Sequence, residues 1–354
     1  MRRVIGLVVT GLGAFLLVFG LLMRYWVPSQ VIKYPLNEYS VTTLSGTGIT
    51  YFSPSLLREF PDVSATETKT VEGDVASGSS AIAVWGSFTA IEDTTNHTAI
   101  QDASQRSAFN RRTGLLVSCC AAALGSDTKV RQAGQGFVFP FGTRHQTYEV
   151  FDATLHAPVA FQFAGTGTID GLPVDRFTEH VTSQRFGQQT LPGSLVGEPQ
   201  QATVSLPESL TAASTYWVDP LTGAVVDQTL DQTVELQGST AAERLVLLGG
   251  TLAQTAPSVR AAVASSRDQH ARITLIQSTI ALTGILLGLI ALIAGILLVA
   301  RAPEPWVPSY DDDEVEDLED LAASGPGRPQ AGSAAARVST SSSRAVAGGS
   351  GGSP

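Results

Sequence analysis

Cysteine is almost absent from this sequence: among 354 residues only Cys119 and Cys120 occur, and they are adjacent. A disulfide between neighbouring cysteines requires unusual geometry, so we expect two small, buried, apolar side chains instead. Cross-links between distant parts of the chain therefore do not hold the fold together. So low a cysteine count neither indicates nor excludes an oxidising compartment.

The sequence also lacks the motifs of common enzyme chemistry. It contains no G-x-S-x-G nucleophile elbow. The stretch GTGTIDG (165–171) has no lysine for a phosphate loop and reads as a turn between strands. No two histidines have the i, i+2 or i+4 spacing of a local metal site; they are His97, His145, His156, His180 and His270. We therefore predict no catalytic residue, no cofactor-binding residue, no metal ligand and no bound cofactor.

Positive charge is scarce as well. The formal net charge is −10, from 22 Lys and Arg against 32 Asp and Glu, and this balance argues against a nucleic-acid partner. Only the first 26 residues are purely basic, with Arg2, Arg3 and Arg24 and no acidic residue. In the large central part the only basic pair is Arg111-Arg112, in FNRRTG. This pair could contact a lipid headgroup or an acidic partner, although a solvated turn is the simpler reading.

Two long apolar runs are present, and each is long enough to cross a bilayer as a helix. The first runs from Val4 to Met23 and is followed by Tyr25 and Trp26, which are typical of a membrane interface. Its length and the bulky residues after it favour an uncleaved anchor over a cleaved signal peptide. A second run, from Ile280 to Ala300, ends at Arg301.

Small residues at four-residue spacing suggest that the two membrane helices pack together. Gly284 and Gly288 form such a face in the second helix, and Gly6, Thr10 and Ala14 form one in the first. The alternative is that glycine is simply common in membrane helices. Two spans place both termini on one side, and Arg2 and Arg3 favour the cytoplasm. Residues 27–272 would then lie outside the cytoplasm, anchored in the inner membrane.

The part between the spans is rich in strand signals. The clearest is STYWVDPLTGAVVDQT (214–229), in which aromatic and β-branched residues flank the turn Asp219–Gly223. Further turns are expected at Ser45–Gly48, Ala76–Ser80 and Asp170-Gly171. A short helix is expected in SPSLLREF (53–60). A longer one, broken at Gly249-Gly250 and Pro257, is expected over 241–272, where Leu245, Leu248 and Leu252 form one stripe.

These signals predict a membrane-anchored, mainly β (α+β) protein in which two transmembrane helices flank a large antiparallel, extracytoplasmic β-rich domain. The predicted parts are a transmembrane anchor (1–26), the β-rich domain (27–240), a helical membrane-proximal segment (241–272), a transmembrane helix (273–301) and a cytoplasmic tail (302–354). The tail is acidic and then rich in Gly, Ser and Ala, with few bulky apolar residues, so we expect it to be disordered.

Three motifs, together with the two-helix frame, resemble a known family. GDV…IAVWGSFTAI (73–91), DGLPVDRF (170–177) and YWVDPLTGAVVD (216–227) look like the actinobacterial PorA-like porin family of two-pass envelope proteins. The resemblance covers roughly residues 1–300 and implies a channel in the envelope. The architecture is also similar, more loosely, to class B scavenger receptors, which implies a lipid-binding domain close to a membrane.

The sequence therefore favours a non-enzymatic envelope protein. Its expected partner is a membrane lipid or glycolipid, which the extracytoplasmic domain binds or hands on, and other envelope proteins are further candidates. The alternative is a porin or channel-forming protein, and an enzyme of envelope assembly is third. Neither apolar run offers a polar stripe for a pore, because Thr10 and Thr283 are almost their only polar side chains.

Overall fold

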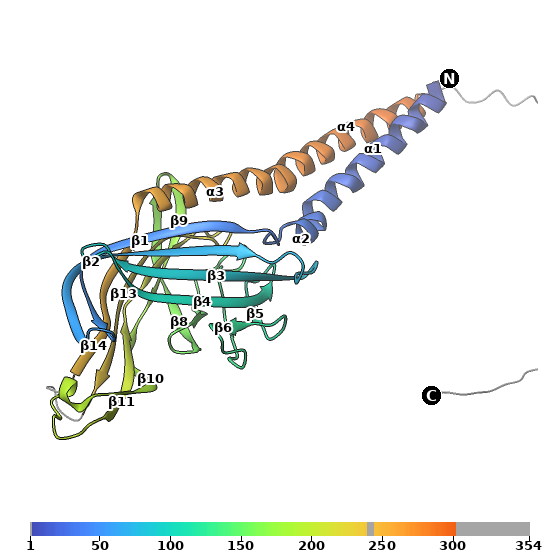
Figure 1. The fold of residues 1–354 in the computed structure, drawn as a ribbon. Coiled ribbons are helices and arrows are strands. Elements are labelled where there is room, and N and C mark those ends of the chain that lie inside the picture. The colour runs from blue at the N-terminus through green and yellow to red at the C-terminus, as the bar shows by residue number, and fades with distance from the viewer. Residues whose placement is uncertain (1, 239–243, 302–354) are drawn as a thin grey trace, which may run out of the picture. The chain divides into compact units, whose positions relative to one another are not determined.

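The computed structural model describes residues 2–238 and 244–301, which form a curved antiparallel sheet and a hairpin of long helices (Figure 1). The predicted tail, 302–354, lies outside the described residues. The helical elements are α1 (Arg2–Tyr25), α2 (Val27–Val31), η1 (Gly193–Val196), α3 (Ala256–Thr274), η2 (Leu275–Ile280) and α4 (Ala281–Ala300). The strands are β1 (Tyr39–Ser53), β2 (Arg58–Gly73), β3 (Ile82–Asp93), β4 (Thr98–Asn110), β5 (Leu116–Val117), β6 (Ala123–Leu124), β7 (Tyr148–Asp152), β8 (Ala157–Ile169), β9 (Leu172–Glu179), β10 (Val181–Leu191), β11 (Val204–Ala212), β12 (Thr215–Val218), β13 (Val225–Gln237) and β14 (Arg244–Gln254).

Helices α1 and α4 pack antiparallel along two stripes of small residues. The buried residues recur every seven positions: Gly6, Gly13 and Gly20 in α1, and Ala281, Gly288 and Gly295 in α4. A Cβ atom on Gly13 would lie 2.4 Å from the backbone nitrogen of Leu292, and one on Gly288 would lie 2.6 Å from that of Leu17. The two backbones therefore touch, as small-residue faces allow in membranes.

The expected packing face of α1 is only partly right. Its members Gly6 and Thr10 lie at or near the contact, but Ala14 is exposed and Gly13 takes its place. Gly284, one turn before Gly288, lies beside the contact, since its Cβ would be 3.4 Å from the Cα of Gly20. The rest of both helices exposes apolar side chains, and both helices are long and apolar enough to span a membrane.

In the described residues one 14-stranded sheet runs in the order β5-β4-β3-β2-β1-β14-β13-β12-β9-β8-β7, with β10, β11 and β6 attached to its sides. The segment Gly134–Gly136 joins the two outer strands of this order. Leu116 donates its N–H to Gly134, and Gln135 exchanges backbone hydrogen bonds with Glu149 and Phe151. The sheet is thus closed at one end, and the result is a half-barrel with an inner and an outer face.

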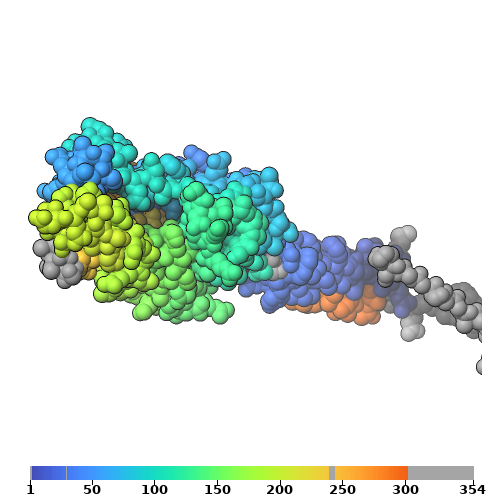
Figure 2. Space-filling model, turned by 60° about the horizontal axis from the view of Figure 1, so that its bottom comes forward, coloured from blue at the N-terminus to red at the C-terminus, as the bar shows by residue number. Residues whose placement is uncertain are grey.

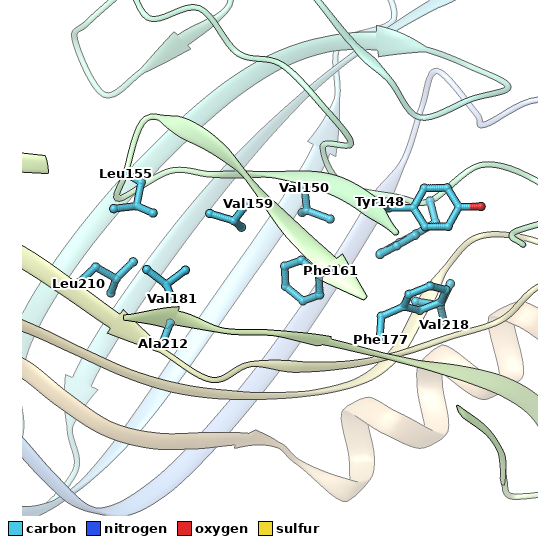
Figure 3. Packing of buried hydrophobic residues seen from close by; sticks show 11 residues of the cluster. Tyr148, Val150, Leu155, Val159, Phe161, Phe177, Val181, Leu210, Ala212 and Val218 are labelled. Atoms are coloured by element: carbon cyan, nitrogen blue, oxygen red, sulfur yellow. The ribbon is translucent and has the colours of Figure 1, made fainter. Parts of the chain in front are cut away.

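The inner face holds the largest apolar cluster. Figure 3 shows how side chains from β7, β8, β9 and β12 point toward one another. The rings of Tyr148 and Phe177 lie 5.7 Å apart, and Phe161, Phe177 and Val218 are almost fully buried. Each such side chain stabilises the fold by about 1.5–3 kcal/mol. A smaller aromatic cluster around Tyr34, Trp85 and Phe109 fills the closed end.

Three local expectations were wrong. The expected turn at Ser45–Gly48 is a bulge in the continuous strand β1, because Gly46 lets β14 approach so closely that a Cβ would lie 2.1 Å from the oxygen of Thr251. The expected helix in 53–60 is the turn between β1 and β2. The expected helix over 241–272 begins only at Ala256, because β14 pairs with both β1 and β13 before it.

The cysteines also differ from expectation. Cys119 and Cys120 form a disulfide and are exposed in the turn between β5 and β6. The turn lies at the end of the sheet, between the two-residue strands β5 and β6, and there both side chains face solvent.

Candidate functional site

Polar side chains from distant strands gather on the inner face of the half-barrel. Glu67 on β2 is paired with Leu44, which is fully buried in the core, so both face inward. Glu179 on β9 is paired with Phe161 of the core, and Tyr216 on β12 with Phe177. Lys69 lies two residues after Glu67 and shares its face, and Asp152 ends β7. We call Glu67, Lys69, Asp152, Glu179 and Tyr216 the interior polar cluster.

Burial dominates the electrostatics of this cluster. It raises the pKa of Glu179 to about 7; the Ser214 hydroxyl opposes this rise and Asp152 adds to it. The side chain is only 4 % exposed, and its Oε1 has no hydrogen-bond partner. Burial also raises the pKa of Tyr216, and the carboxyls of Glu179, Asp152 and Glu67 raise it further. Three carboxyls from three strands therefore all raise the pKa of one phenol.

A single lysine partly balances these carboxyls. Burial raises the pKa of Glu67 while Lys69 lowers it, and burial lowers the pKa of Lys69 while Glu67 raises it. The ammonium of Lys69 lies 5.7 Å from the centre of the Phe137 ring. Among the described residues, no group of three or more His, Cys, Asp or Glu side chains could hold a metal ion. The interior polar cluster thus combines three carboxyls, one ammonium and one phenol on the inner face.

The interior is open to solvent on one side. Lys69, Asp152 and Tyr216 are only half-buried, although they face inward. Figure 2 shows a hollow between the yellow-green lobe of β10 and β11 and the teal strands around β4. Apolar surface adjoins the polar groups, since the ring of Tyr216 stacks on Phe161 at 4.5 Å. A molecule that entered this hollow would meet both carboxyls and aromatic rings.

The turn Asp219–Gly223 has a different role: it connects the sheet to the membrane helices. Asp219 is fully buried and accepts hydrogen bonds from the N–H of Leu221 and the hydroxyl of Thr222. Nε2 of His270, on α3, lies 2.8 Å and 2.9 Å from its two carboxylate oxygens. We call this arrangement the Asp219 latch.

The N-terminal connector, residues 32–38 between α2 and β1, also reaches the Asp219 latch. The hydroxyl of Tyr34 lies 2.6 Å from the carbonyl oxygen of Phe139 and 2.5 Å from that of Thr222. Burial raises the pKa of Tyr34, and the nearby charge of Asp219 raises it further. The two segments that join the β domain to the membrane helices, the N-terminal connector and α3, therefore meet at one turn of the sheet.

The two arginines of the predicted pair differ in their surroundings: Arg111 is hydrogen-bonded within the fold, and Arg112 is exposed. Arg111 donates through Nε to the carbonyl oxygen of Tyr34 at 2.7 Å and through Nη1 to that of Ser79 at 3.3 Å, and burial lowers its pKa. Its guanidinium thus ties the connector to the β2–β3 loop. The side chain of Arg112 is exposed. Neither arginine adjoins Gly284 or Gly288, which lie within the helix hairpin.

Sequence reasoning missed the interior polar cluster. Its carboxyls are separated by 85 residues between Glu67 and Asp152 and belong to strands that are not neighbours in the chain. Alternation along a strand would have assigned each residue to a face. It would not have shown that the sheet closes and brings these faces together.

The fold defines a class of protein: a β half-barrel carried by a hairpin of two membrane-spanning helices. A family model described as Porin PorA matches residues 5–297 of the chain. The chain therefore belongs to the porin PorA family, and its expected resemblance to that family is confirmed. No curated protein matches the sequence. The likeness to class B scavenger receptors stays a prediction.

Proposed function

We propose that this envelope protein receives an amphipathic lipid or glycolipid in the open interior of its half-barrel. The observation that carries the proposal is the mixed lining of this interior. Half-buried polar groups of the interior polar cluster lie beside the aromatic rings of Phe161, Phe177 and Phe137. Ligand sites are typically concave and mostly apolar, with a few convergent polar groups. The exposed Arg112 is a candidate contact for a lipid headgroup.

Channel formation is the second candidate, and the family description favours it. The charged residues on the outer face of the sheet argue against a barrel whose strands span a bilayer. Glu72 and Asp102 are exposed there and Arg106 is half-exposed, whereas a transmembrane barrel presents an apolar band to lipid. The helix hairpin, in turn, packs through glycines and leaves no polar path.

A matched pair of substitutions on β3 tests the interior. Thr89 is half-buried and faces inward beside Lys69, while Ala90 is its half-buried neighbour on the outer face. We expect Thr89→Trp to fill the interior and to lower the amount of lipid that copurifies with the full-length protein at least about tenfold. Ala90→Trp should leave that amount unchanged. Mass spectrometry of gently extracted protein measures it.

Conductance measurements on the same purified protein distinguish lipid uptake from channel formation. Wild-type protein should give no stepwise conductance in planar bilayers. Reproducible single-channel steps that respond to Thr89→Trp would support the channel instead, and equal lipid in all three proteins would contradict uptake into the interior.

We further propose that the protein is anchored in the inner membrane, with both termini in the cytoplasm and residues 27–272 outside. The two spans and the basic residues Arg2 and Arg3 support this orientation. A cysteine at Ser80, an exposed position in the β2–β3 loop, should react with a membrane-impermeant thiol reagent in intact cells. A cysteine at Ser343 should react only after lysis. Wild-type protein, whose two cysteines are paired, is the background control, and the reverse pattern would overturn the orientation.

A further inference from the structure

A second concave surface lies on the outer face of β2, β3 and β4. It has a volume of about 630 Å³. Gly86 and Phe88 line its floor and alternate along β3 with Trp85, which is buried on the inner face. The loop Gly73–Val75 and strand β6 form its rims. We call it the outer groove, and it is separate from the interior that the proposed function uses.

The outer groove offers apolar surface that no part of the described chain covers. Phe88 is 51 % exposed and Val75 is 53 % exposed. A phenylalanine exposed to this extent leaves about half of its surface open to a ligand. Aromatic faces beside polar groups are typical of binding surfaces.

A fixed polar network stands beside this ring. Nη2 of Arg106 lies 2.6 Å from Oδ2 of Asp74 and 3.0 Å from Oγ of Ser77. The Ser77 hydroxyl donates to the same carboxylate at 2.7 Å, and these hydrogen bonds hold the pKa of Asp74 well below its usual range. Charge-assisted hydrogen bonds of this kind keep donors and acceptors in place before a ligand arrives.

Gly86 leaves the floor of the groove open. A Cβ atom at this position would meet nothing closer than the oxygen of Glu72 at 3.9 Å, and its backbone has no positive φ. Neither backbone conformation nor crowding within the described chain requires glycine here. Glycine inside a strand weakens it and often marks a place where a ligand approaches closely.

The charges of the groove limit the ligand class. Its ionisable side chains are Glu72, Asp74 and Arg106, so its net charge is −1 and a phosphate or carboxylate group would be repelled. An uncharged ring with many hydroxyls suits both the exposed aromatic face and the network of donors and acceptors. We propose that the outer groove binds a neutral saccharide, which stacks on Phe88 and hydrogen-bonds to Arg106 and Glu72.

The saccharide could be free or the headgroup of a glycolipid, since the groove lies close to the membrane connector. The N–H of Gly73, on its rim, donates to the carbonyl oxygen of Glu38, only 13 residues after the end of α1 at Tyr25. Both sources share the chemistry that the groove would recognise.

The test uses the full-length protein in nanodiscs and two substitutions in the groove. The probes are short neutral glucan, mannan, galactan and arabinan oligosaccharides. Isothermal titration calorimetry measures their binding to the protein. We expect at least one to bind. Gly86→Leu, which fills the floor, and Phe88→Ala, which removes the ring, should each weaken that binding at least tenfold. Leu56→Ala alters another exposed apolar side chain, in the β1–β2 turn, and should leave binding unchanged.

A second arm of the experiment distinguishes a free saccharide from a glycolipid headgroup. Two results would overturn the proposal that the outer groove binds a saccharide. Nanodiscs that contain a neutral glycolipid should compete with the free saccharide if the ligand is a headgroup, and should not compete if it is free. The absence of binding by every probe in both arms would reject the site. Binding that survives Gly86→Leu would do the same, provided that the variant unfolds at the wild-type temperature. Because Gly86 and Phe88 do not face the interior, a failure here leaves the lipid proposal untouched.

Discussion

Replacement of Gly223 by valine should be among the most destabilising single substitutions in the β domain. Gly223 has φ +75°, a conformation that β-branched residues rarely adopt. Its added Cβ would lie 2.2 Å from the carbonyl oxygen of Phe139 and 2.6 Å from the hydroxyl of Tyr34. The strained φ costs about 1–3 kcal/mol, and displacement of the Phe139 segment adds to it. We expect a total loss of roughly 3–5 kcal/mol in the free energy of unfolding.

Gly197 provides the matched control. It has φ +78°, but a Cβ atom there would have no neighbour within 4 Å. Gly197→Val therefore reports the cost of the backbone conformation alone, and the difference between the two variants reports the close approach at the latch. Denaturant titration of the full-length protein in detergent measures both. Equal losses would show that the contacts of Gly223 with Phe139 and Tyr34 contribute nothing.

The Asp219 latch explains why such a marked turn occurs in this chain. Asp219 and Thr222 are fully buried, and the hydrogen bonds of the turn reach α3 through His270 and the connector after α1 through Tyr34. The buried carboxylate of Asp219 is tolerated because its oxygens are hydrogen-bonded to Leu221, Thr222 and His270. The turn thus fixes the half-barrel to both membrane helices. The adjacent Tyr216 faces the interior, so one motif serves both the anchor and the candidate site.

The membrane helices and the β-rich character could be predicted because they depend on local patterns. A run such as Ile280–Ala300 has one plausible environment, and YWVDPLTGAVV carries its own turn signals. Strand β14 could not be predicted, because Leu245, Leu248 and Leu252 fit a helical stripe equally well and only pairing with β1 and β13 decides the conformation.

Closure of the sheet was equally invisible in the sequence. It depends on backbone hydrogen bonds of the irregular segment Gly134–Gly136, which leave no pattern in the residue types. The interior polar cluster follows from that closure, because Glu67 and Glu179 would otherwise be unrelated polar residues on separate strands. Local patterns thus predict elements and faces, while the site arises from the long-range pairing that brings the faces together.

Replacement of Glu179 by glutamine should stabilise the protein at neutral and alkaline pH. Burial raises the pKa of this carboxyl from 4.5 to about 7, so the folded protein holds the proton more tightly than the unfolded chain. The contribution of Glu179 to stability is then most favourable below pH 4.5 and declines as the pH rises toward 7. The rise from 4.5 to about 7 corresponds to about 3 kcal/mol at 1.36 kcal/mol per pKa unit.

The comparison of two pH values isolates this effect. At pH 4 the neutral carboxyl and the amide are similar, so wild type and Glu179→Gln should have nearly equal free energies of unfolding. At pH 8 the variant should be more stable by up to about 3 kcal/mol, since it no longer places an anion among Asp152, Glu67 and Tyr216. Glu92→Gln, at an exposed position on the outer face of β3, removes one negative charge outside the interior and is the control. If Glu179→Gln were less stable than wild type at pH 8, the interior would instead favour the charged carboxylate, as it would if Lys69 or a bound cation were its partner.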